Sequence, residues 1–145
     1  EVIGRYAPLP ADVPADRASA PCPEVRLSAW WTLEEIRAVL PEPVNAGPTP
    51  DLADLGADCA LALLSTEVYA DDEVLDLGDV RDRAIVLVDG RPIATVGRSD
   101  GSSVVRLPEV DGLLEVLVED LGRINYGPLI GQSKGLAGGR AHKAA

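Results

Sequence analysis

Short runs of branched apolar residues, separated by turn residues, recur along the second half of the chain. They span residues 59–68, 74–77, 84–88, 93–96, 104–107 and 113–121. Runs of this length, bounded by Gly, Asp or Pro, are typical of strands. Their even spacing, without amphipathic helices between them, predicts an all-β fold: an antiparallel β-sandwich of jelly-roll type with one or two short helices.

Three Asp-Gly pairs mark turns between these runs. Asp89-Gly90 lies between two apolar runs, which is a strong short-range signal for a β-hairpin because Gly tolerates positive φ and Asp bonds its own backbone. Asp100-Gly101 and Asp111-Gly112 repeat the pair. We expect them to act in the same way.

The first half of the chain predicts less regular structure. Five prolines fall between residues 6 and 23, which favours an extended linker. Alternation at 25–28 predicts a short strand, and Thr32 with Glu35 forms a capping-box pattern that opens a helix over 33–40, before Pro41. A proline-rich loop over 41–50 and a turn or short helix near 52–55 follow. The predicted organisation is a Pro-rich strap at 1–23, a jelly-roll domain at 24–139 and a flexible tail at 140–145. The domain is predicted to end in a flexible segment, Gly135–Gly139.

Composition narrows the classes of function. The formal net charge of −11 would repel nucleic acid and anionic membranes, so neither is an expected partner. No apolar segment approaches the roughly 20 residues of a membrane span, and the start lacks a signal peptide's apolar run. We expect a soluble domain. A cytoplasmic location is favoured, although the sequence carries no readable targeting signal. Methionine is absent, so we expect a segment excised or processed from a longer protein.

The candidate catalytic groups are poorly arranged. Glu119 and Asp120 are neighbours on a predicted strand, so their side chains point to opposite faces and cannot flank one glycosidic bond. The single histidine, His142, lies in the predicted tail, which argues against a nucleophilic triad. The chain is therefore predicted to carry no catalytic pair.

Metal and cofactor sites are not expected either. Cys22 and Cys59 lack zinc-ligand spacing. They are interpreted as two small hydrophobes, although a disulfide between them stays open. The densest acidic cluster is interpreted as a solvated loop, with calcium binding as the alternative. That cluster comprises Asp71, Asp72, Glu73, Asp76 and Asp79.

Two stretches resemble a known family. Residues 80–90 read VRDRAIVLVDG, similar to the motif HDRA-x-V-x-VDG, with Arg81 in place of His. Residues 114–136 read LEVLVEDLGRINYGPLIGQSKGL, similar to L-x-[IV]-L-V-E-N-x-G-R-[VI]-N-Y-G…KG[IL], with Asp120 in place of Asn. Both motifs, in this order, belong to the first accessory β-domain of the β-galactosidases of glycoside hydrolase family 35. Upstream, residues 58–66 depart from that family's aromatic-rich YG-x-x-x-YRT.

The resemblance implies a non-catalytic accessory domain that braces the catalytic barrel of a β-galactosidase. The parent enzyme would remove terminal β-linked galactose by a retaining double displacement, using two glutamates on a barrel absent from this chain. Two other hypotheses stay open: an autonomous carbohydrate-binding module of galactose-binding-like type, and a protein-interaction sandwich unrelated to sugar. Aromatic residues are scarce, with two Trp, three Tyr and no Phe, which argues against strong autonomous sugar binding.

Arg123, Asn125 and Tyr126 are the predicted site residues. Gly122 can take positive φ and turn the chain so that these three project from a loop at the end of the sheet. Arg123 offers a bidentate fork for a carboxylate or for backbone carbonyls, and Tyr126 offers a ring suited to an interdomain seam or to a sugar face. The loop is therefore predicted either to dock on a neighbouring domain or to edge a β-galactoside pocket. Trp30 and Trp31 are expected in the core or an interface, with a sugar platform as the alternative.

Overall fold

The chain divides into two compact units, Glu1–Glu42 and Pro43–Ala145. A computed structural model describes residues 3–8, 12, 15–44, 51–56 and 61–143.

The first unit contains a single turn of 3-10 helix, η1 (Ile3–Arg5), and one short helix, α1 (Leu33–Arg37). The capping box is confirmed: the Glu35 N–H donates to Thr32 Oγ1 at 3.2 Å, and the Thr32 N–H donates to Glu35 Oε2 at 2.7 Å. None of the helix residues is buried, and the helix stops earlier than predicted because so short a segment gains little without packing. No helix in the described ranges is long and apolar enough to cross a membrane.

The predicted strand at 25–28 is wrong. Residues 15–32 adopt no regular secondary structure, and Val25 and Leu27 are exposed. Alternation alone does not make a strand, because the backbone must also find a partner.

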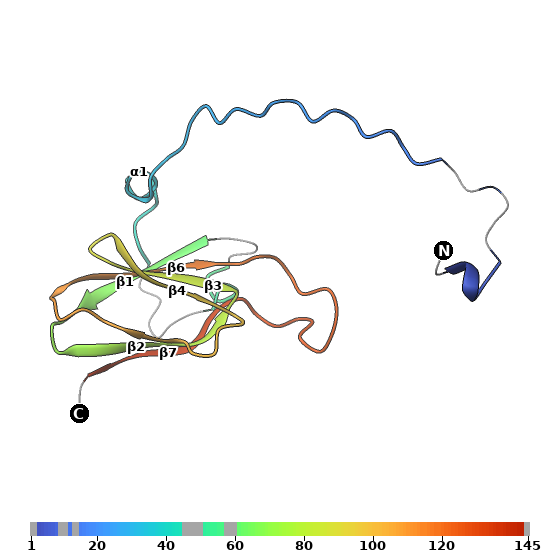
Figure 1. The fold of residues 1–145 in the computed structure, drawn as a ribbon. Coiled ribbons are helices and arrows are strands. Elements are labelled where there is room, and N and C mark those ends of the chain that lie inside the picture. The colour runs from blue at the N-terminus through green and yellow to red at the C-terminus, as the bar shows by residue number, and fades with distance from the viewer. Residues whose placement is uncertain (1–2, 9–11, 13–14, 45–50, 57–60, 144–145) are drawn as a thin grey trace. The chain divides into compact units, whose positions relative to one another are not determined.

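The second unit is a β-sandwich of two antiparallel sheets (Figure 1). One sheet has the order β1-β6-β3-β4 and the other has the order β5-β2-β7. This confirms the predicted all-β sandwich with one short α-helix. The strands are β1 (Leu61–Val68), β2 (Asp72–Arg81), β3 (Arg83–Val88), β4 (Arg91–Gly97), β5 (Val104–Arg106), β6 (Gly112–Glu119) and β7 (Gly135–Lys143).

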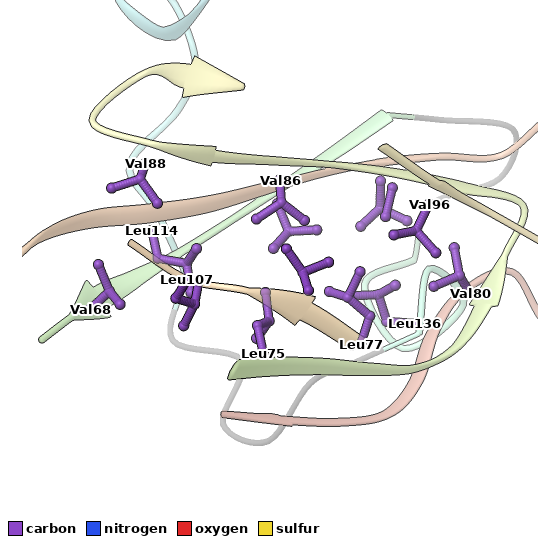
Figure 2. Close-up of a cluster of buried hydrophobic side chains, with 14 residues drawn as sticks. Val68, Leu75, Leu77, Val80, Val86, Val88, Val96, Leu107, Leu114 and Leu136 are labelled. Atoms are coloured by element: carbon purple, nitrogen blue, oxygen red, sulfur yellow. The ribbon is translucent and has the colours of Figure 1, made fainter. Parts of the chain in front are cut away.

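The core lies between the two sheets and consists of aliphatic side chains (Figure 2). In β6 every second residue, Leu114, Val116 and Val118, points into it, and β3 contributes Ala84, Val86 and Val88 in the same alternation. Each fully buried Val or Leu stabilises the fold by about 1.5–3 kcal/mol relative to an exposed one. The composition, rich in Val and Leu and poor in aromatics, is thereby explained.

The predicted flexible segment at Gly135–Gly139 is wrong, and the predicted flexible tail is wrong as far as Lys143. These residues form β7, which pairs antiparallel with β2 from Gly135↔Arg81 to Lys143↔Asp72. The sequence of β7 has no apolar alternation and little intrinsic strand propensity, so pairing with β2 decides its conformation.

The Asp89-Gly90 hairpin is confirmed, and Asp89 itself has a φ of 49°. The two later Asp-Gly pairs do not form hairpins. Asp100-Gly101 lies between β4 and β5, and Asp111-Gly112 lies between β5 and β6, so each connection passes from one sheet to the other. The dipeptide reports a turn, but only the strand pairing decides whether that turn closes a hairpin.

Candidate functional site

The predicted site residues all lie in the β6–β7 loop, residues 120–134. Gly122 has a φ of 105° and turns the chain out of β6 as predicted. Arg123, Asn125 and Tyr126 follow it and are exposed. In Figure 1 this loop extends away from the two sheets.

The outer part of the loop is apolar. Tyr126 is 89% exposed and Ile130 is 62% exposed, and Leu129 is exposed as well; we call these three residues the loop tip. The chain folds back on itself here, because the Ile130 N–H donates to the Gly127 carbonyl at 3.4 Å and the Gln132 N–H donates to the Leu129 carbonyl at 3.1 Å. Several large apolar side chains gathered on one loop are characteristic of an interaction surface.

The base of the same loop is charged and buried. We call Asp82, Arg98, Asp120 and Lys134 the charged cluster. Asp82 accepts hydrogen bonds from Lys134 Nζ at 2.6 Å, from Arg98 Nε at 2.9 Å and from the Leu121 N–H at 2.9 Å. The side chains of Lys134 and Asp120 are only 5% and 3% exposed, and Lys134 Nζ lies 3.8 Å from Asp120 Oδ1. The cluster joins both ends of the loop to the start of β3.

Hydrogen bonding governs the protonation state of Asp82. Burial by itself would raise the pKa of its carboxyl group. The hydrogen bonds from the Lys134 amine, the Leu121 N–H and the Arg98 guanidinium together outweigh burial and hold that pKa below its ordinary value. Asp82 is therefore the anionic centre on which two cations converge.

Further contacts fix the returning part of the loop. Arg98 Nη1 donates to Gln132 Oε1 at 2.6 Å, and Arg81 Nη1 donates to Ser133 Oγ at 2.8 Å. The Leu52 N–H donates to the Lys134 carbonyl at 2.8 Å, and the Leu52 side chain is buried. The turn predicted near 52–55 thus packs against the end of the loop.

At Gly135 the backbone of Asp51 and Leu52 comes unusually close. The φ of Gly135 is 108°, and a Cβ there would lie 2.9 Å from the Leu52 nitrogen. A side chain would satisfy neither constraint. The Lys-Gly pair at 134–135 therefore combines a buried ammonium with a residue that permits this packing.

The acidic groups considered for catalysis or metal binding serve local contacts. Glu119, the last residue of β6, pairs with Arg83, and Asp120 accepts the Gly122 N–H at 2.7 Å. Within the described ranges, no three His, Cys, Asp or Glu side chains gather as a metal site would require. In the predicted acidic cluster all residues except Asp71 lie in β2, so the predicted loop is wrong for them. Asp72 is also buried and accepts the Tyr69 N–H at 2.9 Å.

The remaining candidates lie in the first unit or outside the description. Cys22 is a free, exposed thiol, so its interpretation as a small hydrophobe is wrong; Cys59 lies outside the described residues. Trp30 and Trp31 are exposed, and neither is in a core. Whether they contact a partner stays a prediction.

Sequence reasoning missed Asp82, Arg98 and Lys134 as parts of the site. Asp82 and Lys134 lie within the two stretches that resemble the family, so the resemblance contained a signal for them. Arg98 lies outside both stretches, and only the fold brings it to Asp82.

These features define a small all-β accessory domain, in which an exposed loop is held on an ionic base. Residues 53–141 match the family model described as "Beta-galactosidase, first all-beta domain". The chain therefore belongs to this family, and the resemblance drawn from its two motifs is confirmed.

Several β-galactosidases are similar to parts of the chain. The "Beta-galactosidase" of Xanthomonas manihotis is 40% identical over 91 residues, which cover 61% of this chain and 15% of that protein. The proteins of the same name from Felis catus and Homo sapiens are 43% and 40% identical over 60 residues, which cover 41% of this chain and 9% of each. The chain thus spans a small fraction of the length of these relatives.

Proposed function

We propose that the chain is the accessory β-domain of an enzyme that hydrolyses terminal β-D-galactosyl residues, and that it braces a catalytic barrel lying outside residues 1–145. The β6–β7 loop makes the contact. The observation that carries this proposal is the pairing of an exposed apolar tip with a buried, ion-paired base. In the same proposal the Pro-rich segment at 1–23 acts as a linker.

The loop's anchored base suits it to docking. Association is weakened by the entropy lost when flexible groups become ordered, and a loop that is already held in place loses less. Asp82, Lys134 and Arg98 provide that order before any partner arrives. The tip then supplies apolar area, with Tyr126 as a side chain of the kind that often dominates the energy of an interface.

The proposal is tested by a triple substitution in the full-length protein: Tyr126→Ser, Leu129→Ser and Ile130→Ser. We expect a lower melting temperature and reduced hydrolysis of a chromogenic β-galactoside, because the domain no longer holds the barrel. The matched control is Val104→Ser with Val110→Ser, which removes two exposed apolar side chains elsewhere on the sandwich. Equal effects from both sets would contradict a docking role for the tip.

A second candidate function, galactose binding by the isolated chain, is favoured by one observation: the Tyr126 ring is exposed and free to be covered by a sugar face. Calorimetric titration of the chain with galactose separates the two functions. A bracing domain gives no heat of binding, whereas a binding module gives heat that disappears in Tyr126→Ala. The isolated chain is expected to hydrolyse no β-galactoside in either case.

A further inference from the structure

The two sheets of the sandwich are unequal. Four strands of one sheet face three of the other among the described residues, whereas jelly rolls commonly have eight strands. Between the two sheets, β2 comes close to β4 and β7 comes close to β6. In the four-stranded sheet β1 lies beyond β6, and no strand of the described residues lies beyond β7 to cover the middle of β1.

The exposure of β1 agrees with this uncovered position. Its register with β6 pairs Leu64 with Val116 and Thr66 with Leu114, so both residues share the face that β6 turns to the core. Leu64 is only partly buried, and Thr66 is exposed although it lies on this inner face, whereas Val68 at the end of β1 is buried in the core. The uncovered position is therefore confined to the middle of β1. An inner-face residue is left exposed where the facing layer is missing.

The outer edge of β7 accepts a strand at its first residue. Asp51 forms an antiparallel bridge with Gly135 on the side opposite β2, and the adjoining Leu52 N–H donates to the Lys134 carbonyl. The residues before Asp51 include Pro48 and Pro50, which lack the N–H that a continued ladder requires. Beyond Gly135, β7 has no second neighbouring strand among the described residues.

We propose that the outer edge of β7 accepts one extended strand, supplied by the part of the parent polypeptide outside residues 1–145, which completes a sandwich of four strands on four. This rests on the proposed function, because the chain spans 15% or less of the relatives it matches. A nine-residue edge strand is a ready template for pairing and is usually covered or protected. The incoming strand carries apolar residues at alternate positions, since one face covers Leu64 and Thr66 while its backbone pairs with β7.

Hydrogen–deuterium exchange tests the proposal when the isolated chain is compared with the full-length protein. Peptides from β7 should exchange at least about tenfold more slowly in the full-length protein, because the added strand raises the free energy of opening. Thr66→Arg fills the uncovered position with a charged side chain and should restore fast exchange in β7. Ser65→Arg is the matched control, because Ser65 is equally exposed but lies on the other face of β1.

The outcomes separate this inference from the proposed function. Protection at the loop tip reports docking of the β6–β7 loop, and Thr66→Arg should leave it unchanged. Equal exchange of β7 in the two proteins overturns the inference even if the tip is protected. Protection of β7 that rises with the concentration of the isolated chain, together with a dimer in analytical ultracentrifugation, also overturns it, because a second copy would then be the occupant.

Discussion

The base and the tip of the β6–β7 loop reverse the usual distribution of polarity in a small protein. At the base, Lys134 is charged and buried and the side chains of Asp82 and Asp120 are largely shielded from solvent, whereas the tip presents Tyr126 and Ile130 to solvent. Buried ion pairs add little net stability when compared with apolar packing, but removing one partner is costly. The charges therefore determine the course of the loop, and its exposed apolar side chains are available for the proposed contact outside the sandwich.

Asp82→Ala should have the largest effect on this base. It leaves Lys134 and Arg98 without their common acceptor, and loss of one partner in a buried pair costs about 3–5 kcal/mol of unfolding free energy. Urea denaturation of the isolated chain measures this. The control is Asp79→Ala, which removes a half-exposed partner of Arg81 and should cost less than about 1 kcal/mol. Similar losses for both would mean that the charged cluster does not hold the loop.

Gly135→Ala should have the next largest effect. The residue combines a φ of 108° with a close approach to Leu52, so we expect about 2–3 kcal/mol of destabilisation in the same denaturation experiment. Gly127→Ala is the control, because Gly127 has a φ of 88° but no atom within 4 Å of an added Cβ. Its cost should be about 1 kcal/mol, from backbone strain alone. The difference between the two isolates the packing of Leu52 against the loop.

Lowering the pH should weaken the charged cluster without affecting the loop tip. The pKa of Asp82 is depressed in the folded state, so its contribution to stability is present above the unfolded pKa of about 3.9 and is lost as pH falls through the folded pKa. The unfolding free energy, measured from pH 7 to pH 3, should therefore fall toward the acid end. Asp82→Asn should be less stable at pH 7 and should fall less steeply, and parallel curves would argue against Asp82 as the titrating group.

Tyr126→Ala should have the smallest effect on the isolated chain. The ring is 89% exposed, and substitutions at such positions usually change stability by no more than about 0.5 kcal/mol. Thermal unfolding followed by circular dichroism checks this. A clear loss of stability would show that the ring packs on the sandwich itself, and the contrast between base and tip would then be weaker than the structure indicates.

Strands whose side chains alternate into the core could be predicted from the sequence, because each carries its own pattern. β3 and β6 were found in this way, and so was the Asp89-Gly90 hairpin. β7 could not be predicted, since Gly135, Leu136, Ala137 and Gly138 carry no pattern and depend on β2 for their pairing. The strand expected at 25–28 failed for the opposite reason: it has the pattern but no partner.

The loop was located from its motif and from Gly122, whereas its base was not. The motif contains Lys134, but only the fold shows that its amine lies 2.6 Å from Asp82. Arg98 has no sequence signal at all. Local rules thus predict where a loop begins, and only the assembled sheets show what holds it.

The residues of the charged cluster lie far apart in the sequence, which affects how the domain forms during synthesis. Asp82 lies 52 residues before Lys134, and contacts of such separation form late because long segments must first be ordered. During translation the carboxylate of Asp82 has no ammonium to pair with until residue 134 has left the ribosome. A nascent chain that stalls before this point can pair Asp82 only with Arg98, so the domain should acquire its final stability late in elongation.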